Sequence, residues 1–360
     1  MRRTKRTKTT RAQRRAAKPL RIPSKFERFL GRHRIAVVVA TIVVLVLGGI
    51  GVGVTVQLLR TAWHSATATP PLIGTAVLAP FASKAQHAID EELAMTDAQR
   101  AATEYLAAQP TAYWLTPEQD PSGLAGVTVS ALVNDAREQD VSVALVIYGL
   151  PGRDCGNHSD GGLPMQQYLG WLREIDMAMD TAPDVRKIII LEPDSLALAP
   201  ECGNYVERAE QLREAVSILA GAHTWIYVDA GHSGWLPADQ MAGLISQLNL
   251  GDQIRGFATN VSNYRSTYDE FAYAHELASR LPGLHAIVDT SRNGTATAGA
   301  EWCNPPGQTI GDPTGTFGDA VVDMNLWIKP PGESDGPCHG GPAAGVWWPD
   351  GAVDLTRGVQ

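Results

Sequence analysis

The stretch Lys187-Ile-Ile-Ile-Leu191-Glu-Pro-Asp194-Ser195 predicts a buried strand that ends at a functional edge. Its apolar run is short and continuous, which is typical of a parallel strand covered on both faces. The proline biases Glu192 towards an extended backbone, so the strand ends there and Asp194 projects beyond its tip. Such a carboxyl either acts as a general acid with a raised pKa or caps the next helix, a role that Ser195 could also fill.

Five further apolar runs of similar length alternate with longer segments of helical periodicity. This alternation is that of a βα repeat, in which strands pair in parallel and helices cover them. We therefore expect one α/β domain of about 280 residues, and a barrel fits that length. The expected strands are 142–148, 187–191, 224–228, 256–259, 285–288 and 324–328, and the expected helices include 85–107, 165–179, 206–220 and 266–281.

Polar side chains follow every expected strand at its carboxyl end. Active sites of parallel α/β folds are built at this edge, whereas charge that serves only solubility is scattered along helix faces. Two of these groups have structural alternatives, because Arg153 could form an ion pair with Asp154 and His232 could be a satisfied core histidine. The residues at the strand ends are Tyr148, Arg153, Asp154, Glu192, Asp194, Asp229, His232, Asn260, Asp289, Arg292, Lys329, Glu333 and Asp335.

Four tryptophans, Trp114, Trp235, Trp302 and Trp327, fall inside these polar clusters. Flat indoles with polar edges stack well on pyranose rings, although a single tryptophan is more often core, as we expect for Trp327 within its strand. Carboxylates together with indoles indicate glycoside hydrolysis, in which a carboxylic acid protonates the leaving oxygen. The sequence favours a metal site or a serine nucleophile less, because His-x-x-x-His, Cys-x-x-Cys and Gly-x-Ser-x-Gly spacings are missing.

The first 60 residues differ in composition from the rest of the chain. Residues 1–34 hold 14 Lys or Arg against one acid, and residues 35–56 carry no charge. This pattern predicts a transmembrane signal-anchor helix at 35–59, with the basic segment 1–34 in the cytoplasm and everything after it outside the membrane. A linker at 60–78 would lead to the domain at 79–360. The alternative is a cleaved signal peptide and a secreted product, because Ala66-Thr67-Ala68 resembles a cleavage site.

The part of the chain beyond the expected anchor is acidic. Residues 61–360 hold 15 Lys or Arg and 37 Asp or Glu, a formal charge of −22. Such a body repels phosphate backbones, so we expect no nucleic-acid partner. The four cysteines Cys155, Cys202, Cys303 and Cys338 suit an oxidising compartment, and two disulfides in any of three connectivities, or free buried thiols, are open.

Seven ordered motifs resemble glycoside hydrolase family six, over roughly residues 80–345. The resemblance, which is to cellulases of the membrane-anchored actinobacterial type, implies a distorted seven-stranded parallel β/α barrel, TIM-like, that hydrolyses β-1,4-glucan with inversion and without a metal or organic cofactor. The motifs are Arg153-Asp-Cys-Gly-Asn-His-Ser159, Leu191-Glu-Pro-Asp194, Tyr227-Val-Asp-Ala-Gly-His-Ser-Gly-Trp235, Thr259-Asn-Val-Ser-Asn-Tyr264, Asp289-Thr-Ser-Arg-Asn-Gly294, Trp302-Cys-Asn304 and Trp327-Ile-Lys-Pro-Pro-Gly-Glu-Ser-Asp-Gly336.

The resemblance also implies a role for each residue of the site. Asp194 would be the general acid, Asp154 would raise its pKa, and Tyr148 would crowd the distorted sugar ring. Arg153 would orient the carboxylates. Asp335 matches the proposed base, but a water chain that reaches Asp154, held in part by Ser159, is a competing account. Implied substrate-binding or charge-setting residues are Trp114, Asp229, His232, Trp235, Asn260, Arg292, Trp302, Lys329 and Glu333, and the implied disulfides are Cys155–Cys202 and Cys303–Cys338.

In this resemblance, cleavage of internal bonds or of chain ends depends on whether long loops cover the cleft. The stretch after Glu333 is short, which resembles open-cleft endoglucanases more than tunnel enzymes. We therefore expect a monomer that cleaves internal bonds of cellulose or a related β-glucan outside the membrane. Cellobiohydrolase-type exo action and a membrane-tethered polysaccharide-binding protein with little turnover are the alternatives.

Overall fold

The computed structural model describes residues 75–157, 159, 161–221, 223–295, 301–316 and 318–359. The expected basic segment, the anchor helix and most of the linker lie outside these residues. Among the helices of the described ranges, none has the length and apolar character needed to cross a membrane.

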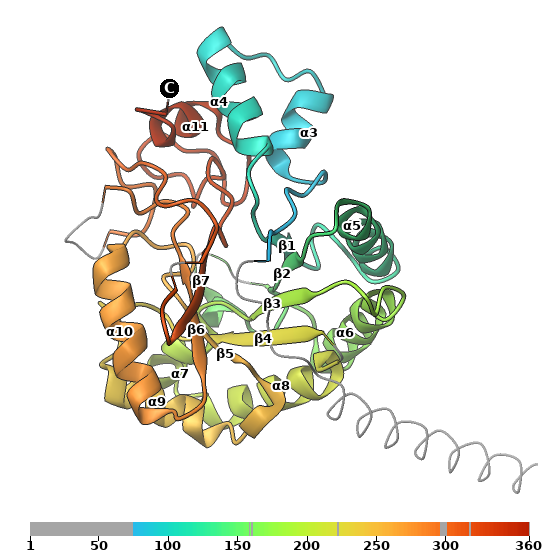
Figure 1. Cartoon of the computed structure of the whole chain (residues 1–360), viewed down its shortest axis with the longest axis vertical. Coiled ribbons are helices and arrows are strands. Elements are labelled where there is room, and N and C mark those ends of the chain that lie inside the picture. The colour runs from blue at the N-terminus through green and yellow to red at the C-terminus, as the bar shows by residue number, and fades with distance from the viewer. Residues whose placement is uncertain are drawn as a thin grey trace, which may run out of the picture. The chain divides into compact units, whose positions relative to one another are not determined.

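Seven parallel strands form one curled sheet, and their order in space follows their order in the chain (Figure 1). Each crossover therefore brings the chain to the neighbouring strand, and all carboxyl ends lie at the same edge. Every residue of β2, β3, β5 and β7 is buried, as expected for strands covered on both faces. The strands are β1 (Tyr113–Leu115), β2 (Val143–Ile147), β3 (Lys187–Leu191), β4 (Thr224–Asp229), β5 (Gly256–Thr259), β6 (His285–Asp289) and β7 (Val322–Leu326).

The two outer strands approach each other just beyond the sheet. The backbone N–H of Ala112 donates to the carbonyl of Trp327 at 2.9 Å, and the indole N–H of Trp114 donates to the carbonyl of Ile328 at 2.8 Å. Within the described residues β1 and β7 form no strand ladder with each other. The expected seven parallel strands are thus confirmed in a half-barrel that these two hydrogen bonds draw together.

The core has an inner and an outer layer because successive side chains of a strand point to opposite faces. Along β3, Ile188 and Ile190 lie inside the curl, whereas Ile189 packs outward against the helices. Helices cover the convex face of the sheet (Figure 1). They are α5 (Ala125–Gln139), α6 (Met165–Met179), α7 (Ser195–Cys202), α8 (Tyr205–Leu219), α9 (Ala238–Gln247) and α10 (Thr267–Arg280), with short 3₁₀ turns η1 (Asp154–Gly156) and η2 (Gly251–Gln253).

Three more helices gather at one end of the domain (Figure 1). The hairpin of α3 (Lys84–Asp90) and α4 (Asp97–Ala107) packs against the late helix α11 (Pro349–Leu355). Their small apolar side chains, such as Ala88 and Ala352, surround the buried rings of Trp327 and Trp347. This cluster joins segments from opposite ends of the domain, and it confirms that Trp327 belongs to the core.

Most of the predicted elements are confirmed, with three differences. The single helix expected at 85–107 is wrong, because Glu92 has a left-handed backbone (φ 51°) and Thr96 starts a new helix with a capping box to Gln99. Strand β7 ends at Leu326 rather than at 328, since the N–H of Trp327 donates to the Thr314 hydroxyl instead of to β6. Strand β1 was not predicted.

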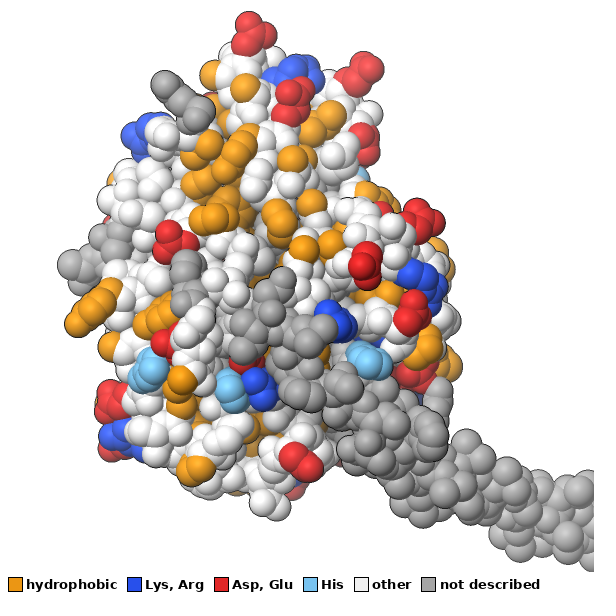
Figure 2. Space-filling model, in the orientation of Figure 1, with side chains coloured by type: hydrophobic (Ala, Val, Ile, Leu, Met, Phe, Trp, Pro, Cys, Tyr) orange, Lys and Arg blue, Asp and Glu red, His pale blue; other side chains and the backbone are white. Residues whose placement is uncertain are grey.

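Charged side chains are spread over the face of the molecule shown in Figure 2. The basic groups visible there are few and separated by acidic, polar and apolar ones. The described side chains visible on this face therefore form no continuous basic patch.

Candidate active site

The carboxyl ends of the strands carry most of the residues expected in the site. Because the strands are parallel and neighbours in sequence are neighbours in space, residues that follow them meet at one edge. Tyr148 follows β2, Asp194 follows β3, Asp229 ends β4, Asn260 follows β5 and Lys329 follows β7.

Asp194 occupies the N-cap position of α7 but does not cap it. Its backbone is left-handed (φ 67°), a strained conformation for a residue with a side chain, and its carboxyl makes no capping hydrogen bond. The hydroxyl of Ser195 is buried and has no partner among the described residues, so it is not the cap either. The capping alternative is therefore wrong, and the Asp194 carboxyl is left for chemistry.

Asp229 holds Asp194 in place and alters its ionisation. One Asp229 oxygen, Oδ2, accepts the backbone N–H of Asp194 at 2.9 Å and that of Gly231 at 3.1 Å. Burial raises the pKa of Asp194 well above its usual range, and the charges of Asp229 and Asp154 raise it further. Burial also raises the pKa of Asp229 to about 7. Burial and these neighbouring negative charges therefore favour the protonated form of the Asp194 carboxyl.

Arg153 braces the loop after β2. Its guanidinium donates to the carbonyls of Tyr148 and Ser159, both at 2.8 Å, and forms an ion pair with Glu118 at 3.1 Å. The ion pair with Asp154 that the sequence left open is wrong, because within the described residues the acidic partner is Glu118. Arg153 therefore fixes the backbone around the carboxylates and does not pair with them.

Tyr148 and Asp154 both belong to this braced loop. The Arg153 guanidinium lies 4.4 Å from the centre of the Tyr148 ring, and the Trp114 ring approaches Tyr148 edge-on at 5.3 Å. Asp154 is half-buried, and its carboxylate accepts the backbone N–H of Ser159 at 2.7 Å. The phenol, the carboxylate and Ser159 thus lie together beside the tip of β3.

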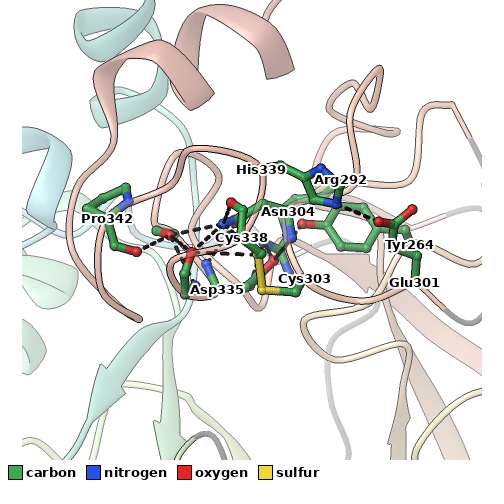
Figure 3. Close-up of a disulfide and its surroundings, with 11 residues drawn as sticks. Tyr264, Arg292, Glu301, Cys303, Asn304, Asp335, Cys338, His339 and Pro342 are labelled. Atoms are coloured by element: carbon green, nitrogen blue, oxygen red, sulfur yellow. Dashed lines mark hydrogen bonds and ion pairs between the residues drawn. A yellow bond between two sulfur atoms is a disulfide. The ribbon is translucent and has the colours of Figure 1, made fainter.

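Asp335 is bound on several sides (Figure 3). Its carboxylate accepts hydrogen bonds from the Arg292 guanidinium at 2.8 Å, the Tyr264 hydroxyl at 2.8 Å and the Asn304 N–H at 3.0 Å. Arg292 is only 1% exposed and lies over the Tyr264 ring at 4.4 Å. Arg292, which is expected to bind substrate, holds Asp335 in this structure.

Lys329, Glu333 and Trp114 form a second polar group of the site. The Lys329 ammonium lies 3.2 Å from Glu333 Oε2 and 5.4 Å from the centre of the Trp114 ring. Lys84 of α3 adds a second cation, 3.7 Å from Glu333 Oε1, and also donates to the carbonyl of Gly345. Lys84 was not predicted from the sequence, because only the folded chain brings α3 to this loop.

The other expected sugar contacts differ in how accessible they are. Trp302 is 40% exposed, and Trp235 is half-buried with its ring centre 5.5 Å from that of His232. Burial lowers the pKa of His232 to about 4, with Arg265 adding to the effect, so this imidazole is neutral at pH 6 and above.

Asn260 is fully buried, and its amide is bonded to the backbone of Arg265 and Asp289. Asn260 thus joins the loop that follows β5 to the end of β6.

Asp289, at the end of β6, connects the loops that form the site. It is fully buried, and its Oδ1 accepts the N–H groups of Ser291 at 2.9 Å and Ile328 at 3.2 Å. Its Oδ2 accepts those of Ser262 and Lys329, both at 3.0 Å. One carboxylate therefore joins the loops that follow β5, β6 and β7. The sequence signals for Asp289 were its position at the end of β6 and its place in the motif that runs to Gly294.

Both expected disulfides are confirmed. Cys155 pairs with Cys202, which ties the loop after β2 to the end of α7. Cys303 pairs with Cys338, which ties the loop of Trp302 to the loop of Asp335 (Figure 3). No described group of three or more His, Cys, Asp or Glu side chains is arranged to hold a metal ion.

Comparisons with known proteins agree on one family. A family model described as glycosyl hydrolases family 6 matches residues 75–359. Endoglucanase A of Cellulomonas fimi is 38% identical over 262 residues, which are 72% of this chain and 57% of that protein. Endoglucanase A of Thermobispora bispora is 40% identical over 260 residues, 70% of this chain and 55% of that protein. The chain thus spans little more than half the length of these two relatives.

A solved structure shows the same arrangement. The endoglucanase Cel6 from Mycobacterium tuberculosis, solved in complex with a thio-linked cellobiosyl cellobioside, superimposes with a TM-score of 0.72 at 35% identity. The match covers 80% of this chain and 98% of that one. The curled sheet and its site edge are therefore those of a family with solved carbohydrate complexes.

Proposed function

The chain belongs to glycosyl hydrolase family 6, and we propose that it is an inverting endoglucanase that hydrolyses internal β-1,4-glucosidic bonds of cellulose or a related β-glucan. The observation that carries this proposal is the Asp194 carboxyl, which makes no capping bond and whose pKa is raised by burial and by the charges of Asp229 and Asp154. Two relatives named endoglucanase and a relative bound to a cellobiosyl cellobioside support the substrate class.

The reaction is a single displacement at the anomeric carbon. Asp194 gives its proton to the glycosidic oxygen as the bond to the leaving sugar breaks, and a water forms the new bond from the opposite face. The proton of that water passes through a second water to Asp154. Within the described residues the Asp154 carboxylate accepts only the Ser159 N–H, whereas Asp335 already has three donors, which favours Asp154 over Asp335 as the acceptor.

The substrate would lie along the edge formed by the exposed and half-buried rings. Trp302, Trp235 and Trp114 offer stacking faces, and Lys329 with Glu333 offers charged hydrogen-bonding groups beside Trp114. Asn260 holds the loops beneath this surface, and Arg292 holds Asp335. The protein needs no metal or organic cofactor for these steps, since a carboxylic acid, water and a carboxylate suffice.

Reducing-end release from carboxymethylcellulose, measured together with viscosity, tests the proposal. Endo action lowers the viscosity before much reducing sugar accumulates. Release of cellobiose with little loss of viscosity would show the exo alternative. Binding of cello-oligosaccharides without any new reducing ends would overturn the enzyme and leave the polysaccharide-binding protein.

We further propose that residues 35–59 anchor the enzyme as a monomer in the cell membrane with the catalytic domain outside. The charge-free stretch after the basic residues 1–34 supports this topology, and the two disulfides suit an oxidising compartment. Fractionation of cells that express the full chain should place the enzyme with the membrane. A mature protein in the culture fluid that starts near Thr69 would overturn the anchor.

The basic limb of the pH profile depends on the pKa of Asp194, which burial raises and the charges of Asp229 and Asp154 raise further. The acid works when protonated, so activity is present below the raised pKa of Asp194 and is lost as the pH rises through it. Asp229→Asn removes a neighbouring negative charge, lowers the pKa of Asp194, and should shift the basic limb of kcat/KM by about one pH unit to lower pH. Asp239→Asn, an exposed change on α9, is the control and should leave the profile unchanged. A basic limb of Asp229→Asn that stays at the wild-type pH would contradict this prediction.

Lys84 should affect substrate binding more than chemistry. Lys84→Ala removes one of the two cations beside Glu333 and the bond to the loop carbonyl of Gly345. Because the pair is partly exposed, we expect KM for cello-oligosaccharides to rise about two- to fivefold with little change in kcat. Arg280→Ala, which breaks an exposed pair on α10, is the matched control. A loss confined to kcat would refute this role.

A further inference from the structure

Glu192 is a buried carboxylate that the proposed chemistry does not use. It is 1% exposed and follows β3 with a left-handed backbone (φ 51°), two residues before Asp194. Its Oε1 accepts the N–H of Gly149 at 3.0 Å and the hydroxyl of Tyr168 at 2.8 Å. Its Oε2 accepts the N–H of Leu150 at 3.2 Å. The side chain therefore joins the tip of β3 to the backbone that directly follows Tyr148.

The peptide group that follows Tyr148 is held at both its C=O and its N–H. Arg153 donates to its carbonyl oxygen at 2.8 Å, and the N–H of the same peptide, which belongs to Gly149, donates to Glu192. The carbonyl of Gly149 accepts the N–H of Leu163 at 2.9 Å. A methyl group at Gly149 would lie 2.9 Å from the Trp171 ring, so the segment has no space to move in that direction. Loss of the Glu192 contact would thus remove the restraint that joins this loop to the end of β3.

The surroundings of Glu192 suit its ionised form. The groups that reach its two oxygens are N–H and O–H donors from the loop after β2 and from α6, and the charged groups that face it are Arg153 of that loop and Arg208 of α8. Burial raises the pKa of Glu192 to about 7 in spite of these donors. A proton on the carboxyl would face two N–H groups, and Tyr168 would have to turn its hydroxyl to accept it.

We propose that Glu192 is a positioning residue of the active site, which in its ionised form holds the Tyr148 loop against the strand end that presents Asp194. The inference rests on the proposed hydrolysis, because its effect is to place the Tyr148 ring correctly relative to the sugar at the cleavage point. Asp154 and Glu192 line one small pocket together with Arg153, Ser195 and Arg208. The contact of Glu192 with the Tyr148 loop therefore also supports the motif that contains Arg153 and Asp154.

Glu192→Gln tests this role with almost no change in shape. The glutamine amide group turns an N–H donor towards the donors of the loop, so we expect kcat on cellotetraose to fall about 10- to 100-fold with KM within about twofold. The acid limb of the kcat profile should also change, because the group that titrates near pH 7 is gone. Glu174→Gln is the matched control, since Glu174 likewise accepts two backbone N–H groups, those of Gly123 and Gly126 at 2.7 Å, but on α6 away from the strand ends.

A double-mutant cycle with Tyr148→Phe separates positioning from general stability. If Glu192 acts through the Tyr148 loop, Glu192→Gln should cost much less in the Tyr148→Phe background than alone, whereas independent effects would multiply. Should Glu192→Gln fail to fold, Tyr168→Phe removes one donor from the same carboxylate and should lower kcat about three- to tenfold. Unchanged kcat and pH profile in an active, folded Glu192→Gln enzyme would overturn the inference. Inactive wild-type enzyme would instead refute the proposed function.

Discussion

Replacing Asp194 by asparagine is expected to lower kcat on carboxymethylcellulose by about 10³-fold, because the variant has no proton to give to the leaving oxygen. Asparagine keeps the shape of the side chain, and the N–H of residue 194 can still donate to Asp229 as it does now at 2.9 Å. Affinity for cello-oligosaccharides should therefore stay within about threefold, since binding and chemistry depend on different groups.

A substrate with a better leaving group makes this expectation sharper. Dinitrophenyl cellobioside needs little protonation of its leaving oxygen, so Asp194→Asn should slow its cleavage far less than the cleavage of cellulose. Asp239→Asn, an exposed change on α9, serves as the control. Equal losses on both substrates would assign Asp194 a role other than general acid.

The largest expected effect on stability comes from Asp289→Asn. Each oxygen of Asp289 accepts two backbone N–H groups, so the asparagine amide group would place its own donors against two of them. We expect a loss of about 3 kcal/mol, because buried donors are left unsatisfied, and a fall of roughly 6–12 °C in the melting temperature.

Thermal unfolding followed by circular dichroism measures this loss. Asp269→Asn is a suitable control, because its carboxylate accepts a hydrogen bond from Ser266 on the exposed start of α10. Its expected cost is below about 0.5 kcal/mol. A melting temperature of Asp289→Asn close to that of the wild type would show that the loops after β5, β6 and β7 do not depend on this carboxylate.

The sequence was most informative about the strands. Short apolar runs followed by polar residues predicted β2 to β7, because a strand covered on both faces leaves a continuous hydrophobic signal. Strand β1 has only three residues, and Trp114 in its middle is half-buried, so its pattern is too short to recognise. The break between α3 and α4 could have been predicted from Thr96 and Gln99, which form a capping box.

The site could be predicted where it depends on strand ends and not where it depends on long-range packing. Asp194, Asp154 and Tyr148 were placed correctly because parallel strands end at one edge. The partners of the charged groups were missed, since Glu118 reaches Arg153 and Lys84 reaches Glu333 from elements whose position no local pattern encodes. Arg292 was expected to bind substrate for the same reason, and only the fold shows that it holds Asp335.

The packing of α3 and α4 on α11 has a consequence for the order of folding. The contact of Lys84 with Gly345 joins residues 261 positions apart, and closing so long a loop is entropically costly. During synthesis β1 to β6 can pair in order as they emerge, but Lys84 has to wait for Glu333 and α11. Such non-local contacts slow folding and form late. The polypeptide therefore gains its complete Lys84–Glu333–Lys329 surface only in a late kinetic step, after most of the sheet already exists.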